Sequence, residues 1–188
     1  AVEMVYKEAE TGKKVYTLGP IIHNEQVVQE LEEKGVQVIN SIEELADIKD
    51  GTVVIRSHGV SEQVIRQLEK YDIKIVDATC PFVSKIHRIV QEKYREGFQI
   101  VIIGNRTHPE VEGIKGWGDA RTMVVKNEEQ MEKLPSFTGE KLCIVSQTTF
   151  NYNKFKELVE IISEKGYNII IRNTICNATE ERQTEARE

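Results

Sequence analysis

Residues 77–85 of the chain, Asp-Ala-Thr-Cys-Pro-Phe-Val-Ser-Lys, decide the fold. An apolar strand pattern at 73–76 runs into Cys80, and a helical pattern begins at residue 84. A similar stretch, Asn-Thr-Ile-Cys-Asn-Ala-Thr, returns at 173–179. A cysteine between a strand and a helix start is well placed to act as a thiolate, because the peptide dipoles there favour negative charge. The two stretches predict a shared site built on matching elements.

Strand and helix patterns alternate along the whole chain. Strands are predicted at 15–18, 36–39, 52–56, 73–76, 98–103, 122–125, 141–145 and 168–171. Helices are predicted up to about residue 10, at 25–34, 42–46, 61–71 and 84–96, after Pro109, and at 127–133 and 155–165. Strands joined by helices predict an α/β fold with parallel sheets and right-handed crossovers.

The order of motifs repeats within the chain. Gly19 and His23 after a strand match Gly104 and His108, Ser57-His58 match Gln147-Thr148, and Cys80 matches Cys176. The repeat predicts a first lobe over 1–80 without its N-terminal strand and cysteine loop, a second over 81–176, and the start of a third over 177–188.

Both ends of the chain fall within helical patterns, so both are expected to be truncated. The spacing of the second copy places a third equivalent cysteine a few residues before Ala1. The expected whole is a trefoil-like arrangement of three lobes, two of them present here, with three cysteines converging on a pseudo-threefold axis.

Composition limits the function classes. Three cysteines without a signal peptide disfavour a disulfide framework and favour a cytoplasmic protein. No apolar run is long enough for a membrane span, and a net charge of −6 disfavours a nucleic-acid partner.

Three thiolates could bind zinc or an iron–sulfur cluster. The chain has no C-x-x-C pair, which argues against a zinc ribbon or a ferredoxin-type run. Cys80, Cys176 and the cysteine expected upstream could hold a [4Fe–4S] cluster with one iron open to substrate. The alternatives are a zinc hydrolase using both cysteines and one histidine, and cysteines that are inert.

Polar side chains follow the other strands. His23, His58 and His108 suit a phosphate or diphosphate, since histidines donate hydrogen bonds and helix N-termini add N–H groups. Glu110 is a candidate proton donor. Thr148 and Thr149 could orient a ligand hydroxyl, although threonines there could simply cap a helix, and Glu110 could be an ordinary first-turn carboxylate.

Two further residues are expected to be structural. Cys143 lies inside a buried strand pattern and is predicted to be core. His87 lies among apolar positions of a predicted helix.

Six ordered motifs resemble one known family. They are Leu-Gly-Pro-Ile-Ile-His-Asn at 18–24, Arg-Ser-His-Gly-Val at 56–60, Asp-Ala-Thr-Cys-Pro at 77–81, His-Pro-Glu-Val-Glu-Gly at 108–113, Ser-Gln-Thr-Thr at 146–149 and Asn-Thr-Ile-Cys-Asn-Ala-Thr at 173–179. Over all 188 residues the chain resembles the 4-hydroxy-3-methylbut-2-enyl diphosphate reductases of the non-mevalonate isoprenoid pathway. The family's first cluster cysteine and its third lobe, with a Ser-x-Asn-type segment, have no counterpart within the chain.

The resemblance implies reductive removal of an allylic hydroxyl at a [4Fe–4S] cluster, with an external electron donor such as ferredoxin or flavodoxin. It implies that Cys80 and Cys176 ligate the cluster. It further implies that His23, His58 and His108 bind the diphosphate, that Glu110 and Thr148 are catalytic, and that Thr149 and Val83 line the substrate pocket. With two of three thiolates, the chain alone is expected to lack reductase activity. The competing class is a non-catalytic α/β phosphate-binding module.

Overall fold

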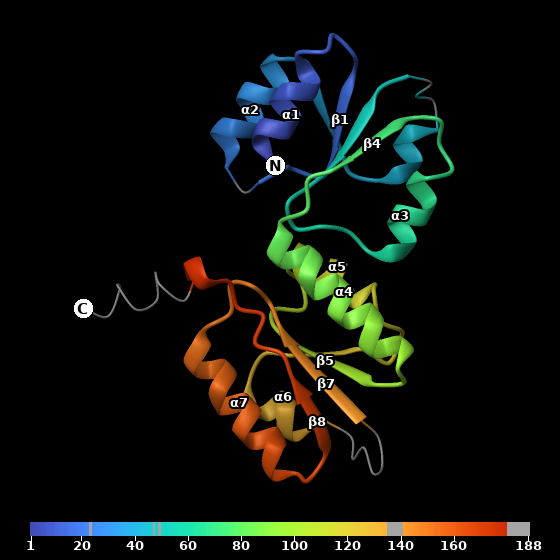
Figure 1. Ribbon diagram of the computed structural model, residues 1–188. Coiled ribbons are helices and arrows are strands. Elements are labelled where there is room, and N and C mark those ends of the chain that lie inside the picture. The colour runs from blue at the N-terminus through green and yellow to red at the C-terminus, as the bar shows by residue number, and fades with distance from the viewer. Residues whose placement is uncertain (23, 47, 49, 135–140, 180–188) are drawn as a thin grey trace, which may run out of the picture. The chain divides into compact units, whose positions relative to one another are not determined.

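The computed structural model describes residues 1–22, 24–46, 48, 50–134 and 141–179. It divides the chain into two compact units, Ala1–Val83 and Ser84–Glu188, and each is described by itself. Figure 1 labels some of the strands of each unit.

The first unit contains one four-stranded parallel sheet. Its elements are α1 (Val2–Ala9), β1 (Val15–Leu18), α2 (Glu25–Glu33), β2 (Val36–Ile39), the 3₁₀ turn η1 (Ile42–Leu45), β3 (Thr52–Ile55), α3 (Glu62–Leu68) and β4 (Lys74–Asp77). The strands lie in the order β2-β1-β3-β4. The central strands β1 and β3 are buried along their length, as expected when helices cover both faces.

The second unit repeats this plan. Its elements are β5 (Gln99–Ile103), α5 (Pro109–Lys115), β6 (Met123–Val125), α6 (Glu128–Glu132), β7 (Lys141–Ser146), α7 (Tyr152–Glu164) and β8 (Asn168–Ile171). Helix α4 (Pro81–Arg95) begins at the end of the first unit and leads into the second. The strand order β6-β5-β7-β8 reproduces the order of the first sheet. The α/β class, the parallel sheets and the presence of two lobes are therefore confirmed.

Alternation along the strands of the second unit sorts side chains onto two faces. Val101, Ile103, Leu142 and Ile144 pack with residues of α6 and α7, whereas Ile100, Ile102, Cys143 and Val145 pack with residues of α4 and α5. Cys143 is fully buried, and this burial raises the pKa of its thiol to about 11. The prediction that Cys143 is core is confirmed.

Two helices begin earlier than the sequence pattern predicted. Helix α4 begins at Pro81 rather than residue 84, because the fixed φ of proline suits the first helical turn. Helix α7 begins at Tyr152 rather than residue 155, because the side chain of Asn151 caps it by accepting from the backbone N–H of Lys154. His87 on α4 is buried and stacks on Trp117, with 5.1 Å between ring centroids.

A charged contact ties α1 to the sheet of the first unit. The carboxylate of Glu8 accepts from Lys74 Nζ at 2.7 and 2.8 Å and from Thr52 Oγ1 at 3.3 Å. The hydrogen bond from Lys74 holds the pKa of Glu8 below its ordinary value of 4.5. The contact joins the helix to β3 and β4, which are distant in sequence.

Glu8→Gln is expected to lower the stability of the first unit by about 1 kcal/mol at pH 7, since the half-exposed Lys74 leaves the pair partly screened. A lowered folded-state pKa means that the carboxylate stabilises the fold above pH 4.5 and that this contribution is lost as the pH falls through the lowered value. Urea unfolding followed by circular dichroism should show the gap between wild type and variant closing at acid pH. Glu3→Gln, at an exposed position of the same helix, is the control. A gap of equal size at pH 3 would contradict the prediction.

Candidate active site

A buried carboxylate and a buried threonine meet at the carboxyl ends of two neighbouring strands. Glu110 lies in the first turn of α5 after β5, and Thr148 follows β7, which pairs with β5. The backbone N–H of Thr148 donates to Oε1 of Glu110 at 2.7 Å, and its Oγ1 donates to Oε2 at 2.7 Å. Glu110 is 2% exposed. Both carboxylate oxygens are therefore held in one orientation by a single residue.

His108 forms the start of α5. Its Nδ1 accepts from the backbone N–H of Glu110 at 3.2 Å, and Pro109 occupies the first helical position. An accepting Nδ1 makes Nε2 the N–H donor of the neutral ring. The histidine thus fixes the helix turn that carries Glu110 and keeps a donor nitrogen on its other side.

Gln147 organises the turn after β7, a role that the sequence reasoning missed. Its Oε1 accepts from the backbone N–H of Asn105 at 3.0 Å, and its Nε2 donates to Thr149 Oγ1 at 3.1 Å. A Cβ on Gly104 would lie 3.0 Å from the Cβ of Gln147 and 2.9 Å from Val111. The close approach explains the glycine at this position. In the sequence, the available signal was a glutamine next to the end of an apolar strand pattern.

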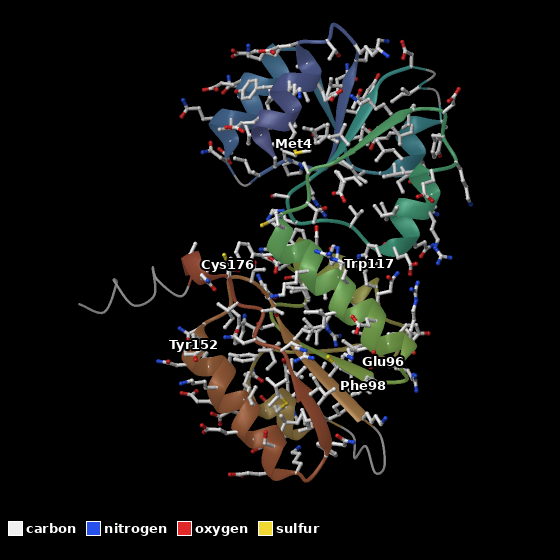
Figure 2. All side chains as sticks on the ribbon, in the orientation of Figure 1. Met4, Glu96, Phe98, Trp117, Tyr152 and Cys176 are labelled. Carbon is white, nitrogen blue, oxygen red and sulfur yellow. The ribbon has the colours of Figure 1, made fainter. Side chains whose placement is uncertain are left out.

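Cys80 and Cys176 occupy equivalent places in the two units. Each directly precedes a helical run and is a half-buried free thiol. The backbone N–H of Cys80 donates to the carbonyl of Ser57 at 2.9 Å, and that of Cys176 donates to the carbonyl of Thr148 at 2.9 Å. Cys176 is labelled in Figure 2, beyond the end of β8. The predicted strand–Cys–helix arrangement is confirmed for both cysteines.

These bonds correct the predicted repeat by one residue. Ser57, not His58, is equivalent to Thr148, because Ile55 pairs with Leu18 in the first sheet while Ser146 pairs with Ile103 in the second. The prediction extended the strand of the first copy through Arg56, but β3 ends at Ile55, whereas Gln147 does directly follow β7. The match of Ser57-His58 with Gln147-Thr148 was therefore wrong.

The turn before each cysteine is also shared. The Oδ1 of Asp77 accepts from the N–H of Thr79 at 2.9 Å, and the Oδ1 of Asn173 accepts from the N–H of Ile175 at 3.1 Å. Asp and Asn favour such turns because their side chains bond the backbone two residues on. The same local device presents both thiols.

The predicted site residues divide between the units. In the second unit the structure brings together His108, Glu110, Thr148 and Cys176, with Thr149 attached through Gln147. In the first unit, His58 is half-buried in the turn after β3, and Val83 is buried in the first turn of α4. His23 lies outside the described residues.

The donor set offers thiols for a metal but is incomplete within either unit. Among the described residues, no three His, Cys, Asp or Glu side chains gather as a metal site. Cys80 and Cys176 are half-buried thiols in equivalent backbone settings, and thiolates are the soft ligands that iron–sulfur clusters use. Each unit offers one such half-buried thiol, and neither supplies a full ligand set among its described residues.

Within the described parts of the chain, no helix is both long and apolar enough to cross a membrane.

Comparison with known proteins decides the family. The family model described as LytB protein matches residues 1–188, the whole chain. The chain belongs to the LytB family. The resemblance seen in the sequence motifs is thereby confirmed.

Two curated relatives of this LytB chain carry the same name. The chain is 47% identical to the 4-hydroxy-3-methylbut-2-enyl diphosphate reductase of Alkaliphilus oremlandii, with 100% of the chain and 66% of the relative covered. It is 45% identical to the enzyme of that name from Caldanaerobacter subterraneus subsp. tengcongensis, with 99% of the chain and 65% of the relative covered. The chain thus spans about two thirds of the length of these relatives.

Solved structures give the same family. The reductase from Plasmodium falciparum superposes with a TM-score of 0.89 at 31% identity, covering 97% of the LytB chain and 58% of that chain. A second reductase structure, titled the terminal enzyme of the non-mevalonate pathway, has a TM-score of 0.79 at 39% identity and covers 97% and 66%. The fold class predicted from the sequence is that of these reductases.

Proposed function

We propose that the chain supplies two lobes of a reductase that removes the allylic hydroxyl of 4-hydroxy-3-methylbut-2-enyl diphosphate. The observation that carries the proposal is the buried Glu110–Thr148 pair in a chain matched over its whole length by the LytB family. In the balanced reaction, one substrate, two electrons and two protons give isopentenyl or dimethylallyl diphosphate and water.

Cys80 and Cys176 are the proposed ligands of a [4Fe–4S] cluster, with a third cysteine contributed from outside the chain. When bound, the cluster would supply electrons and an open iron for the substrate oxygen. The repeated turns of Asp77 and Asn173 would hold the two thiols in equivalent poses.

Glu110 and Thr148 are proposed to move the proton. Protonated Glu110 would donate to Thr148 Oγ1, whose own hydroxyl proton would then be free to turn toward the leaving hydroxyl. Burial keeps water from competing for the carboxyl group. This relay reverses the Thr148-to-Glu110 hydrogen bond seen in the structure.

The remaining predicted residues would hold the substrate. His108 would donate from Nε2 to the diphosphate while its Nδ1 keeps capping α5, and His58 and His23 would add donors from the first unit. Thr149 would lie beside the substrate hydroxyl, and buried Val83 would exclude water. The proposed electron donor is a cytoplasmic carrier such as ferredoxin or flavodoxin.

The test compares two proteins. One is the chain alone, and the other is the extended protein, meaning this chain continued on both sides to the length of its relatives. After anaerobic reconstitution with iron and sulfide, the extended protein should turn over the diphosphate with a chemical reductant, and the chain alone should not. Wild-type-like turnover by the chain alone would refute the requirement for a third lobe.

Iron content separates this proposal from its competitors. An extended protein that binds phosphate but neither iron nor zinc would support a phosphate-binding module. Stoichiometric zinc without iron would support a hydrolase.

A further inference from the structure

A second pair of side chains in the site region plays no part in the proposed chemistry. Ser146 ends β7, and Thr174 lies after β8, two residues before Cys176. Both residues are buried. Four hydrogen bonds link them although they are distant in sequence.

These hydrogen bonds form a closed set. The hydroxyl of Thr174 donates to the carbonyl of Ser146 at 2.6 Å and accepts from the N–H of Ser146 at 2.8 Å. The backbone N–H of Thr174 donates to Ser146 Oγ at 3.2 Å. The two hydroxyl oxygens are 3.1 Å apart, and since the Thr174 proton goes to the carbonyl, Ser146 Oγ is the donor between them. Each of the two hydroxyl groups therefore donates one hydrogen bond and also accepts at its oxygen.

The first unit lacks this arrangement at the equivalent positions. There Ile55 and Ala78 take the places of Ser146 and Thr174, and the N–H of Ala78 donates directly to the carbonyl of Ile55 at 3.1 Å. In the second unit, two hydroxyls stand between the same two stretches of backbone. The hydroxyl pair belongs to the unit that also contains Glu110 and Thr148.

The pair joins the two segments that carry site residues. Thr148 comes two residues after Ser146, and Cys176 comes two residues after Thr174. The N–H of Cys176 donates to the carbonyl of Thr148, whose own N–H and hydroxyl donate to Glu110. Displacement of either segment would therefore shift both the Cys176 thiol and the Glu110 carboxylate.

We propose that Ser146 and Thr174 are positioning residues that hold the Cys176 thiol and the Glu110–Thr148 pair in one fixed geometry. Their positioning of the two segments is a property of the fold, and its use in catalysis rests on the proposed function. Neither residue needs to touch substrate.

The test replaces the hydroxyl and leaves the shape. Thr174→Val is expected to speed hydrogen exchange of the Cys176 and Thr148 amides by about tenfold or more, because buried partners of the lost hydroxyl are left unsatisfied. Thr174→Ser keeps the hydroxyl and is expected to restore protection to within about twofold of wild type. Exchange is measured on the whole chain, by NMR or by fragmentation mass spectrometry.

Three references make the experiment selective. The Cys80 amide, held by Ser57 in the other unit, should not change. The amides of β5 report global opening of the second unit. Thr17→Val is the matched substitution, because Thr17 is buried and its Oγ1 has no hydrogen-bond partner within the described residues; it should leave all of these amides unchanged.

Two results would overturn the proposal. One is unchanged protection of Cys176 in folded Thr174→Val, and the other is an equal loss across β5, which would mean general destabilisation. If Thr174→Val does not fold, Ser146→Ala takes its place, with faster exchange at the Thr174 and Cys176 amides expected. In the extended protein, iron loss to a chelator should be faster in Thr174→Val and normal in Thr174→Ser. Exchange requires no turnover, so failure of the reductase assay alone would not be mistaken for failure of this proposal.

Discussion

Glu110→Gln is expected to lower reductase turnover of the extended protein by roughly 10²–10⁴-fold, the usual contribution of a positioned general acid. The glutamine amide has nearly the shape of the carboxyl group but cannot deliver its proton. Its Oε1 can still accept from one of the two Thr148 donors, whereas its NH₂ group faces the other donor. Single-turnover kinetics with a chemical reductant measure the effect on the chemical step.

The same helix offers a matched control. Glu112 lies two residues after Glu110 on α5 but is exposed, so Glu112→Gln should leave turnover unchanged.

Because Glu110→Gln also leaves a buried donor poorly matched, it should cost about 1–3 kcal/mol of stability, which urea unfolding would detect. Equal loss of turnover in both variants, or full turnover in Glu110→Gln, would remove Glu110 from the mechanism.

Cys176→Ser and Cys80→Ser are expected to abolish turnover of the extended protein and to reduce its iron content after anaerobic reconstitution. Both thiols are half-buried and free, and the backbone N–H of each cysteine donates to an equivalent carbonyl, that of Ser57 or Thr148. A serine oxygen is a harder ligand and a poor replacement for a thiolate on iron. Iron analysis and the visible absorption of the cluster should fall together with activity.

Cys143→Ala is the control for cysteine removal. Cys143 is fully buried in β7 and its thiol pKa is raised to about 11, so it remains protonated near neutral pH. Its replacement should cost about 1 kcal/mol of stability through the small cavity left behind, with iron content and turnover unchanged. Full iron content in Cys80→Ser and Cys176→Ser would show that neither cysteine is a ligand.

The sequence predicted the fold well because its signals were local. The apolar run that became β5 could only be a buried strand, and Pro109 after His108 marked a helix start. The repeat of motifs predicted two sheets of the same plan, and both have the same strand order. Strand ends were harder to predict. Strand β3 ends at Ile55, one residue before its predicted end, and this shifted the predicted repeat by one residue. Strand β7 ends one residue later than predicted, at the polar Ser146.

The contacts within the site were beyond sequence reasoning. Glu110 could be proposed as a proton donor, but its double hydrogen bond with Thr148 depends on side-chain directions across two strands. The Ser146–Thr174 pair was missed because it joins residues from two different strand ends. An alignment of the two copies in the corrected register would have found the pair, because that alignment places Ser146 and Thr174 opposite Ile55 and Ala78 of the first copy.

The carbonyl that accepts from each cysteine amide shows what the two units share and where they differ. The hydrogen bond from the Cys80 N–H to the carbonyl of Ser57 and that from the Cys176 N–H to the carbonyl of Thr148 have the same length, although the side chains at 57 and 148 differ. The backbone contact is the same in both units, and the difference between the units lies in their side chains. The second unit, which contains the Glu110–Thr148 pair, presents its cysteine through the same backbone contact as the first unit. The chemical difference between the units is thus a difference of side chains on a shared backbone arrangement, and exchanging side chains between equivalent positions is a route to redesigning it.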